Sequence, residues 1–246
     1  MKSNPQNIEP GRPARAGQFI LKRRYDIVKA LFGGSLGWKN LLDIGCGNAA
    51  QTAYFAPDVE FIVAMDMVPL AETEGPTQHE RIHFVQSSAM EIPFAANSFD
   101  AVMSYEVLEH VPDDLTMMRE VRRVLKPGGS FVFSVPNKWW IFETHGANVR
   151  GLNWLPWNRL PFVSWLPREI HDSIAKARIY TKQQAVDITN YCGFNVKHSG
   201  YITAPLDVLP EGLLRKSLRK SLFKGDTTDS PFLAVNLFVV AEKPKV

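Results

Sequence analysis

Short apolar runs alternate along this chain with longer amphipathic stretches. Within each run the apolar positions are mostly consecutive, which is typical of strands that other elements cover on both faces. Turn-forming residues separate the runs from the amphipathic stretches. The predicted strands are residues 41–44, 60–65, 81–86, 99–104, 131–135, 194–201 and 232–241.

Amphipathic stretches between these runs predict helices. The clearest begins at Pro112, because proline suits a first turn and the following Asp113 and Asp114 favour the positive end of the helix dipole. Its apolar face contains Leu115, Met118, Val121 and Leu125. The helix is predicted to end at Lys126-Pro127-Gly128-Gly129. Further helices are predicted over residues 18–32, near 50–56, and from Thr181, which has capping-box spacing with Gln184, to Gly193. Strands that alternate with helices predict an α/β fold with a doubly wound, mostly parallel sheet.

Two stretches interrupt this alternation and are predicted to be insertions in a single domain over residues 18–246. Residues 138–170 contain five of the six tryptophans, and residues 205–231 separate the last two predicted strands. Residues 1–17 are polar, with several proline, glycine and basic residues, and are predicted to form a flexible arm.

Composition narrows the class of protein only slightly. Of 246 residues, 45% are hydrophobic and 22% are charged, which is ordinary for a soluble globular protein. The only cysteines, Cys46 and Cys192, exclude a disulfide scaffold and a thiolate zinc site and fit a reducing cytoplasm. A net charge of +3 is too small to indicate nucleic-acid binding. A cytoplasmic location is therefore expected.

A glycine-rich turn joins the first predicted strand to the next helix. It reads Asp43-Ile44-Gly45-Cys46-Gly47-Asn48-Ala49-Ala50, and Asp66 follows at the end of the second strand. The glycines allow the backbone to approach a ligand, and an acid at this spacing can bind ribose hydroxyls. On these residues alone a nicotinamide dinucleotide remains an alternative ligand.

The downstream motifs favour a different cofactor. They are Ile92-Pro93-Phe94, Ser98-Phe99-Asp100-Ala101-Val102, Glu106-Val107-Leu108-Glu109-His110-Val111 and Arg123-Val124-Leu125-Lys126-Pro127-Gly128-Gly129. With the Asp-x-Gly-x-Gly start, their order and spacing over residues 38–137 resemble class I S-adenosylmethionine-dependent methyltransferases of the type 11 group. There is also some resemblance to ubiquinone-pathway O-methyltransferases. The resemblance implies a Rossmann-like, seven-stranded sheet with an antiparallel last strand, and S-adenosylmethionine as cofactor.

The resemblance also implies roles for matching positions. Asp43, Gly45 and Gly47 would hold the methionine end of the cofactor, and Asp66 would bind both ribose hydroxyls. The remaining predicted cofactor contacts are Cys46, Met67, Ser88, Ala89, Met90, Ser104 and Tyr105. Met67 would pack on adenine, Ser88 and Ala89 would flank it, and residues 104–106 would lie beside the sulfonium. Many relatives have aspartate where this chain has Ser88.

The Glu-x-x-Glu-His pattern supplies candidate groups near the methyl. In ubiquinone-pathway O-methyltransferases and small-RNA 2′-O-methyltransferases, a similar pattern with a later histidine is associated with a divalent metal. The resemblance therefore implies a candidate Mg²⁺ site at Glu106, Glu109, His110 and His171. Without a metal, His110, His145 or His171 could act as general base, because neutral imidazole suits that work near pH 7. Glu106 is a further candidate catalytic residue.

The two insertions each have a functional and a packing interpretation. The tryptophans form either a lid over an apolar acceptor or a second small hydrophobic core. Residues 211–224 combine Leu214, Leu218 and Leu222 with basic residues, which predicts a helix that either packs its leucines on the domain or lies on an anionic membrane. A cytoplasmic enzyme with peripheral membrane contact is therefore one expectation.

The leading hypothesis is S-adenosylmethionine-dependent methyl transfer, with oxygen on a small or lipophilic molecule as the acceptor. RNA ribose 2′-O-methylation is an alternative, although the chain has no recognisable RNA-binding module and nucleic acid is not the favoured partner. A non-catalytic cofactor-binding subunit, with the tryptophan-rich stretch as its interface, is another. The sequence predicts neither the acceptor nor the oligomeric state.

Overall fold

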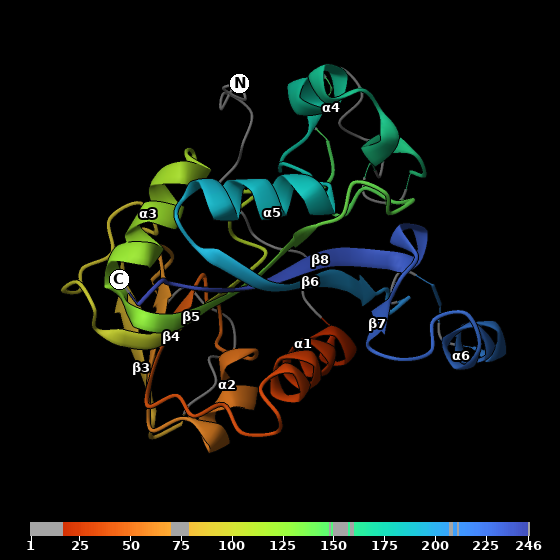
Figure 1. Ribbon diagram of the computed structural model, residues 1–246. Helices are drawn as coiled ribbons and strands as arrows, with labels where there is room; N and C mark the ends of the chain where they lie inside the picture. Colours follow the sequence, from red (N-terminus) through yellow and green to blue (C-terminus); the bar gives the residue numbers. More distant parts are fainter. Residues whose placement is uncertain are drawn as a thin grey trace.

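A single eight-stranded sheet organises the chain in the computed structural model, which describes residues 17–69, 79–147, 149, 157, 160–206, 209–210 and 212–245 (Figure 1). The strands are β1 (Asn40–Ile44), β2 (Phe61–Asp66), β3 (Ile82–Gln86), β4 (Phe99–Tyr105), β5 (Leu125–Pro136), β6 (Asn195–Thr203), β7 (Thr227–Thr228) and β8 (Ala234–Glu242). Their order is β3-β2-β1-β4-β5-β8-β6-β7. The pairs among β1 to β5 are parallel, and β8 runs antiparallel to both β5 and β6. The predicted α/β fold is confirmed, with the two-residue β7 as an additional strand.

Helices cover both faces of this sheet. They are α1 (Gln18–Leu31), α2 (Thr52–Phe55), α3 (Asp114–Val124), α4 (Arg168–Ile174), α5 (Lys182–Tyr191) and α6 (Leu213–Lys220), with short 3-10 turns at Ala56–Asp58, Val163–Trp165 and Pro231–Leu233. Helices α1 and α2 lie on one face, and α3 and α5 on the other (Figure 1). The apolar core is accordingly divided in two: Met118 and Ala185 belong to one cluster, and Val28 and Phe55 to the other.

Local signals explain where the helices begin. The Asp113 side chain accepts a hydrogen bond from the Leu115 amide, so Asp113 caps α3. At α5 the Thr181 hydroxyl accepts from the Gln184 amide, and the Gln184 side chain accepts from the Thr181 amide. This reciprocal pair is the predicted capping box.

One predicted boundary is wrong. The sequence places Leu125 on the α3 face and ends the helix at residues 126–129, yet β5 already begins at Leu125. Leu125 pairs with Phe99, and the register shifts before Ser130 pairs with Ala101. The backbone of Gly128 and Gly129 also bonds to Lys243, so pairing within the sheet overrides the local turn signal.

The parallel strands share one functional edge. Ile44 is level with Met65 of β2 and with Ser104 of β4, so the carboxyl ends of these three strands meet. Ligands of open α/β sheets bind in the crevice outside this edge. The first strand-to-helix turn, residue 66 and residues 104–106 are therefore brought to one place.

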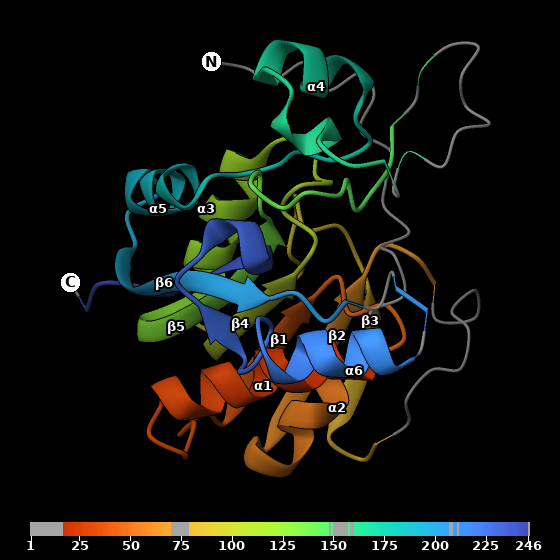
Figure 2. The same ribbon diagram turned by 90° about the vertical axis from the view of Figure 1, so that its right-hand side faces the viewer.

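The two insertions are described in part. Residues 1–16 of the predicted arm lie outside the described residues, as do residues 148, 150–156 and 158–159 of the tryptophan-rich insertion. In the basic insertion the predicted helix is α6, which is seen in the foreground near α1 in Figure 2. Among the described residues, no helix combines the length and apolar character needed to cross a membrane.

Candidate functional site

The turn after β1 is shaped by close backbone packing. Gly45 has φ +73°, and a Cβ there would lie 2.1 Å from Cγ2 of Val107, so a side chain would need a shift of the β4–α3 connection. The Gly45 and Cys46 amides both donate to the Met65 carbonyl, at 2.7 and 3.1 Å. These bonds hold the turn directly against the end of β2.

Asp66 holds the same turn from its other side. Its Oδ2 accepts a hydrogen bond from the Gly47 amide at 2.8 Å, and its Oδ1 accepts from the Val68 amide at 2.9 Å. The side chain is half-buried, and a carboxylate has about four acceptor positions, so oxygen lone pairs remain for a ligand. Asp66 is therefore oriented before any ligand binds.

Asp43 is buried beneath the turn, with 2% of its surface exposed. The Thr52 hydroxyl donates to its Oδ2 at 2.5 Å. Burial raises the pKa of Asp43 to about 7, despite the opposing effect of the Thr52 hydrogen bond. Near neutral pH this carboxyl can therefore be either a proton donor or an anion.

The shifted pKa of Asp43 predicts a pH-dependent stability of the ligand-free protein. The pKa of Asp43 is about 7 in the folded chain and 3.8 for an ordinary solvated aspartate, so between these pH values the folded state holds a proton that the unfolded state has lost. The Asp43 contribution to stability is full below pH 4, and it falls by up to about 1.4 kcal/mol per pH unit as the pH rises toward 7. Denaturant unfolding of wild type and Asp43→Asn at several pH values measures this contribution. The difference in unfolding free energy between the two proteins should change between about pH 4 and 7 and should be constant above pH 7. A difference independent of pH would contradict the assignment.

The residues predicted to surround adenine lie next to this turn. Met67 is 56% exposed directly after Asp66, and Ser88 is exposed after β3. The Ser88 hydroxyl accepts a hydrogen bond from the Met90 amide at 3.1 Å, while Ala89 and Met90 are half-buried against the core. The exposed Met67 side chain offers an apolar surface on which the face of a planar ring can pack. The backbone groups of the turn at residues 88–90 can form hydrogen bonds with the edge of such a ring.

The end of β4 is covered by an arginine from α1. Ser104 and Tyr105 are buried, and burial raises the pKa of the Tyr105 hydroxyl. The Arg24 guanidinium carbon lies 5.1 Å from the centre of the Tyr105 ring, and its Nη2 lies 3.3 Å from Oε1 of Glu106. Because Arg24 is only 5% exposed, α1 brings a buried positive charge to the carboxyl edge.

Glu106 is fixed in an unusual backbone conformation. Its φ is +60°, which costs a non-glycine residue of the order of 1 kcal/mol or more and is typically found at functional sites. Oε1 accepts from the Ser134 hydroxyl at 3.0 Å and from the Asn236 side-chain amide at 2.8 Å. Arg24, Ser134 and Asn236 were not predicted from the sequence; each contacts Glu106 from a different part of the chain.

Three potential metal-binding side chains lie beside Glu106. One ligand atom each of Glu109, His110 and His145 lies within 4.8 Å of the other two. His145 Nε2 is 3.5 Å from Oε1 of Glu109 and 4.0 Å from Oε2 of Glu106, and the His110 and His145 rings are 4.8 Å apart. Glu109 is fully buried, and its two oxygens have no hydrogen-bond partner among the described residues. Burial, together with the neighbouring Glu106 carboxylate, raises the pKa of Glu109 well above its usual value.

His171 occupies a different position from the one that the sequence suggested. It is fully buried, with Nε2 3.0 Å from Oε2 of Glu143 and Nδ1 3.3 Å from Oδ1 of Asp172. Burial lowers its pKa, but the hydrogen bonds with Asp172 and Glu143 outweigh this and raise the pKa above its usual value. The Glu143 side chain also accepts from the His145 amide. His171 therefore supports His145 through Glu143, and neither His171 nor Glu106 belongs to the group of three ligand atoms.

The described part of the tryptophan-rich insertion is an aromatic cluster. Trp140 is buried against Phe223 of the basic insertion, and Ala204 and Leu206 complete this small core. Trp139 and Trp165 are 37% and 39% exposed and both contact the Phe232 ring. These contacts fit the packing interpretation, while Trp154 lies outside the described residues. A lid over an acceptor stays a prediction.

Comparison with known proteins places this geometry in context. Residues 42–133 match a family described as a methyltransferase domain. A ubiquinone biosynthesis O-methyltransferase of Cereibacter sphaeroides is 28% identical over 171 residues, which cover 68% of this chain and 64% of that protein. Methyltransferase GfsG of Streptomyces halstedii is 33% identical over 138 residues, covering 51% of this chain and 45% of the other. The match thus spans less than two thirds of these relatives' length.

A solved structure supports the fold independently. An S-adenosylmethionine-dependent methyltransferase from Mesorhizobium loti superposes with a TM-score of 0.60 at 19% identity, covering 91% of this chain and 100% of that one. At this identity the likeness concerns the arrangement of strands and helices. It extends well beyond residues 42–133, into the antiparallel strands that carry Asn236.

Proposed function

We propose that this chain is a class I S-adenosylmethionine-dependent methyltransferase and that it transfers the methyl group to an oxygen atom of a small or lipophilic acceptor. The observation that carries this proposal is the group formed by the buried Glu109 and the half-buried His110 and His145 at the carboxyl edge of the sheet. It lies next to Glu106, one residue beyond the end of β4, where the resemblance places the sulfonium.

Methylation of an oxygen acceptor would require a proton acceptor such as the one that Glu109, His110 and His145 can provide. The methyl carbon is already activated by the positive sulfonium, so displacement needs alignment and exclusion of water. A hydroxyl acceptor must also lose its proton, and a neutral imidazole can accept it. His145 is positioned for this task because its Nε2 lies within 4.0 Å of both glutamates, while Glu143 orients its backbone.

A divalent cation fits the same residues. The two buried Glu109 oxygens lack hydrogen-bond partners among the described residues, and a buried carboxylate of this kind is costly unless a cation or a proton satisfies it. Glu109, His110 and His145 would hold Mg²⁺ or a similar ion, through mixed oxygen and nitrogen ligands. When bound, the ion would lower the pKa of an acceptor hydroxyl.

A product screen tests the proposal. The protein is incubated with S-adenosylmethionine and with catechols, alkylphenols, primary amines or short RNA, and products are detected by mass spectrometry. We expect methyl ethers from a phenolic or catecholic acceptor, identified by the chemical shift of the methyl protons in NMR spectra of the purified products. Exclusive methylation of nitrogen or carbon, or of RNA ribose, would refute the proposed acceptor class. His83→Ala, at an exposed histidine on β3, serves as a control that should leave product formation unchanged.

A further inference from the structure

We propose that α6 and the start of α1 form a docking surface for an anionic lipid bilayer. This docking surface consists of Phe19, Leu213, Leu214, Lys216, Lys220 and Leu222. The proposal concerns the location of the protein at a membrane surface, and it does not depend on which acceptor is methylated.

The apolar side chains of the docking surface are exposed. Leu213, Leu214 and Leu222 are 86%, 70% and 62% exposed, and Phe19 is 53% exposed. Of the three leucines spaced by four residues, only Leu218 packs against the small core around Trp140. The packing interpretation of this segment therefore accounts for one leucine. Neighbouring large apolar side chains in water indicate an interaction site.

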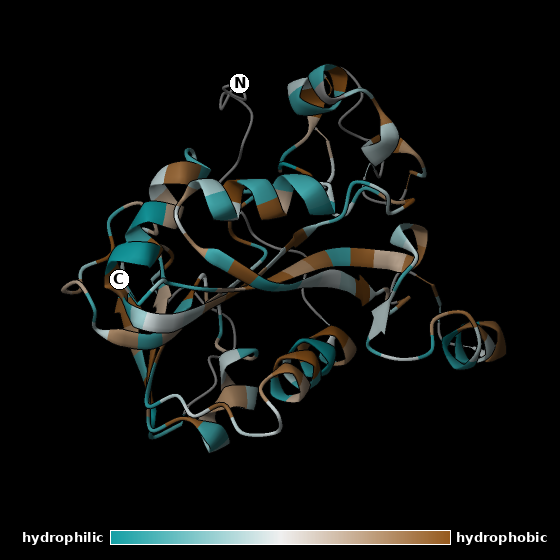
Figure 3. Ribbon diagram, in the orientation of Figure 1, coloured by the Kyte–Doolittle hydropathy of each residue, from teal (hydrophilic) through white to brown (hydrophobic). Residues whose placement is uncertain are grey.

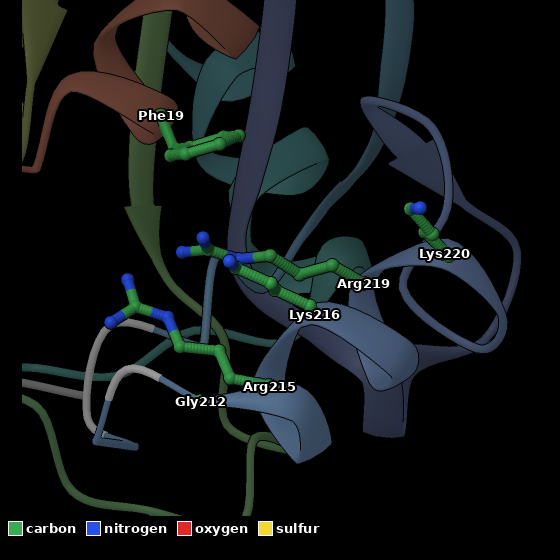
Figure 4. A pocket seen from close by; sticks show the side chains of 6 residues that line it. All are labelled: Phe19, Gly212, Arg215, Lys216, Arg219 and Lys220. Atoms are coloured by element: carbon green, nitrogen blue, oxygen red, sulfur yellow. The ribbon is translucent and has the colours of Figure 1, made fainter.

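Cations lie beside Phe19, on the same short helix as Leu213 and Leu214. Phe19 and Gly212, together with Arg215, Lys216, Arg219 and Lys220, line a hollow of about 400 Å³, and none of these lining residues is acidic (Figure 4). The Arg219 guanidinium lies 4.1 Å above the Phe19 ring and its Nε donates to the Pro205 carbonyl at 2.7 Å. Lys216 and Lys220 are exposed. The hollow thus combines fixed arginines with two lysines that can reach lipid phosphates.

The pattern favours a bilayer over a nucleic acid. Basic residues alone would suit any polyanion, since phosphate contacts require only charge. Exposed leucines on the same short helix gain nothing from a phosphate backbone, but they gain free energy when they enter the boundary between headgroups and acyl chains. The hydropathy colouring of α6 shows this mixed apolar and polar character (Figure 3).

The docking surface is connected to the candidate active site. β6 runs parallel to β4 and β5, because both β5 and β6 are antiparallel to β8, so its end at Thr203 lies at the carboxyl edge. Arg23 on α1 donates to the carbonyls of Thr203 and Phe223, at 2.6 and 3.1 Å. The next residue, Arg24, contacts Glu106. A bilayer bound here would face the edge of the sheet at which the reaction occurs.

Vesicle co-sedimentation tests the proposal with the full-length chain. Vesicles of phosphatidylcholine, with or without phosphatidylglycerol, are mixed with wild type and two variants. Lys216→Glu/Lys220→Glu reverses charge, and Leu213→Ser/Leu214→Ser removes apolar surface. Lys39→Glu/Lys197→Glu is the matched control, since it makes the same change of charge at exposed lysines on β6 and before β1. Circular dichroism and S-adenosylhomocysteine binding check that each variant is folded.

We expect wild type and the control to pellet with anionic vesicles and to remain in solution with neutral ones. The partition coefficient should fall at least about tenfold in the charge variant, since each basic residue near an anionic surface contributes about one factor of five. It should also fall about tenfold in the leucine variant. Failure of wild type to pellet, or unchanged pelleting of either variant, would overturn the proposal. Stronger binding of wild type to single-stranded RNA, unaffected by the leucine changes, would overturn it in favour of a polynucleotide.

Discussion

Replacing Asp66 with alanine should weaken S-adenosylhomocysteine binding by at least about a hundredfold, as measured by isothermal calorimetry. The two charge-assisted hydrogen bonds predicted between Asp66 and the ribose hydroxyls would contribute roughly 1.5–3 kcal/mol each, and both would be lost. The same substitution frees the Gly47 and Val68 amides, which Asp66 accepts from in the folded protein. The glycine turn then loses its fixed shape, so the loss of affinity has a second, structural component.

Two further variants separate these components. Asp66→Asn keeps an acceptor for one amide but removes the charge, and we expect an intermediate loss of affinity. Asp58→Ala removes a carboxylate that pairs with Lys29 and Tyr25, and it should leave binding within about twofold. Wild-type affinity in Asp66→Ala would contradict the assigned ribose contact.

Substituting Glu109 by glutamine or His145 by alanine should lower kcat by about a hundredfold to ten-thousandfold, the usual effect of removing a general base. Cofactor affinity should stay nearly unchanged, because neither residue belongs to the predicted cofactor contacts. Initial rates with the best acceptor from the product screen, combined with calorimetry, measure both quantities. If the same residues also hold a divalent ion, a chelator should abolish turnover and Mg²⁺ or Mn²⁺ should restore it.

His198→Ala provides the control for this pair, since His198 is exposed on β6 and should leave kcat unaltered. Activity that survives both Glu109→Gln and His145→Ala would exclude the cluster from catalysis. Turnover that is lost in both variants but is insensitive to chelators would identify His145 as a base that acts without a metal.

The fold was largely predictable because its signals are local. Continuous apolar runs mark buried strands, and the caps at Asp113 and Thr181 mark helix starts within a few residues. The turn at residues 43–47 was equally visible, since its glycines and acids lie close together in the chain. The start of β5 was not visible, because Gly128 and Gly129 are held in place by Lys243, more than a hundred residues away.

The candidate catalytic site was predictable only in part for the same reason. Glu109 and His110 are adjacent, and their motif could be read directly. Glu106, however, is held by Arg24, Ser134 and Asn236, which lie on α1, β5 and β8. None of these has a sequence signal of its own. The choice between His145 and His171 likewise depends on Glu143, whose position between them appears only in three dimensions.

The position of β8 has a consequence for biosynthesis. β8 is the last strand along the described chain, yet it lies between β5 and β6 in the sheet. A growing chain on the ribosome therefore cannot attach β6 to β5 until residues 234–242 have emerged, and Asn236, which holds Glu106, arrives with them. Strand pairs between residues far apart in the sequence, such as β5 with β8, form slowly. The predicted cofactor turn near the start of the chain can be assembled well before the candidate active site is complete, so we expect an incomplete chain to bind the cofactor without using it.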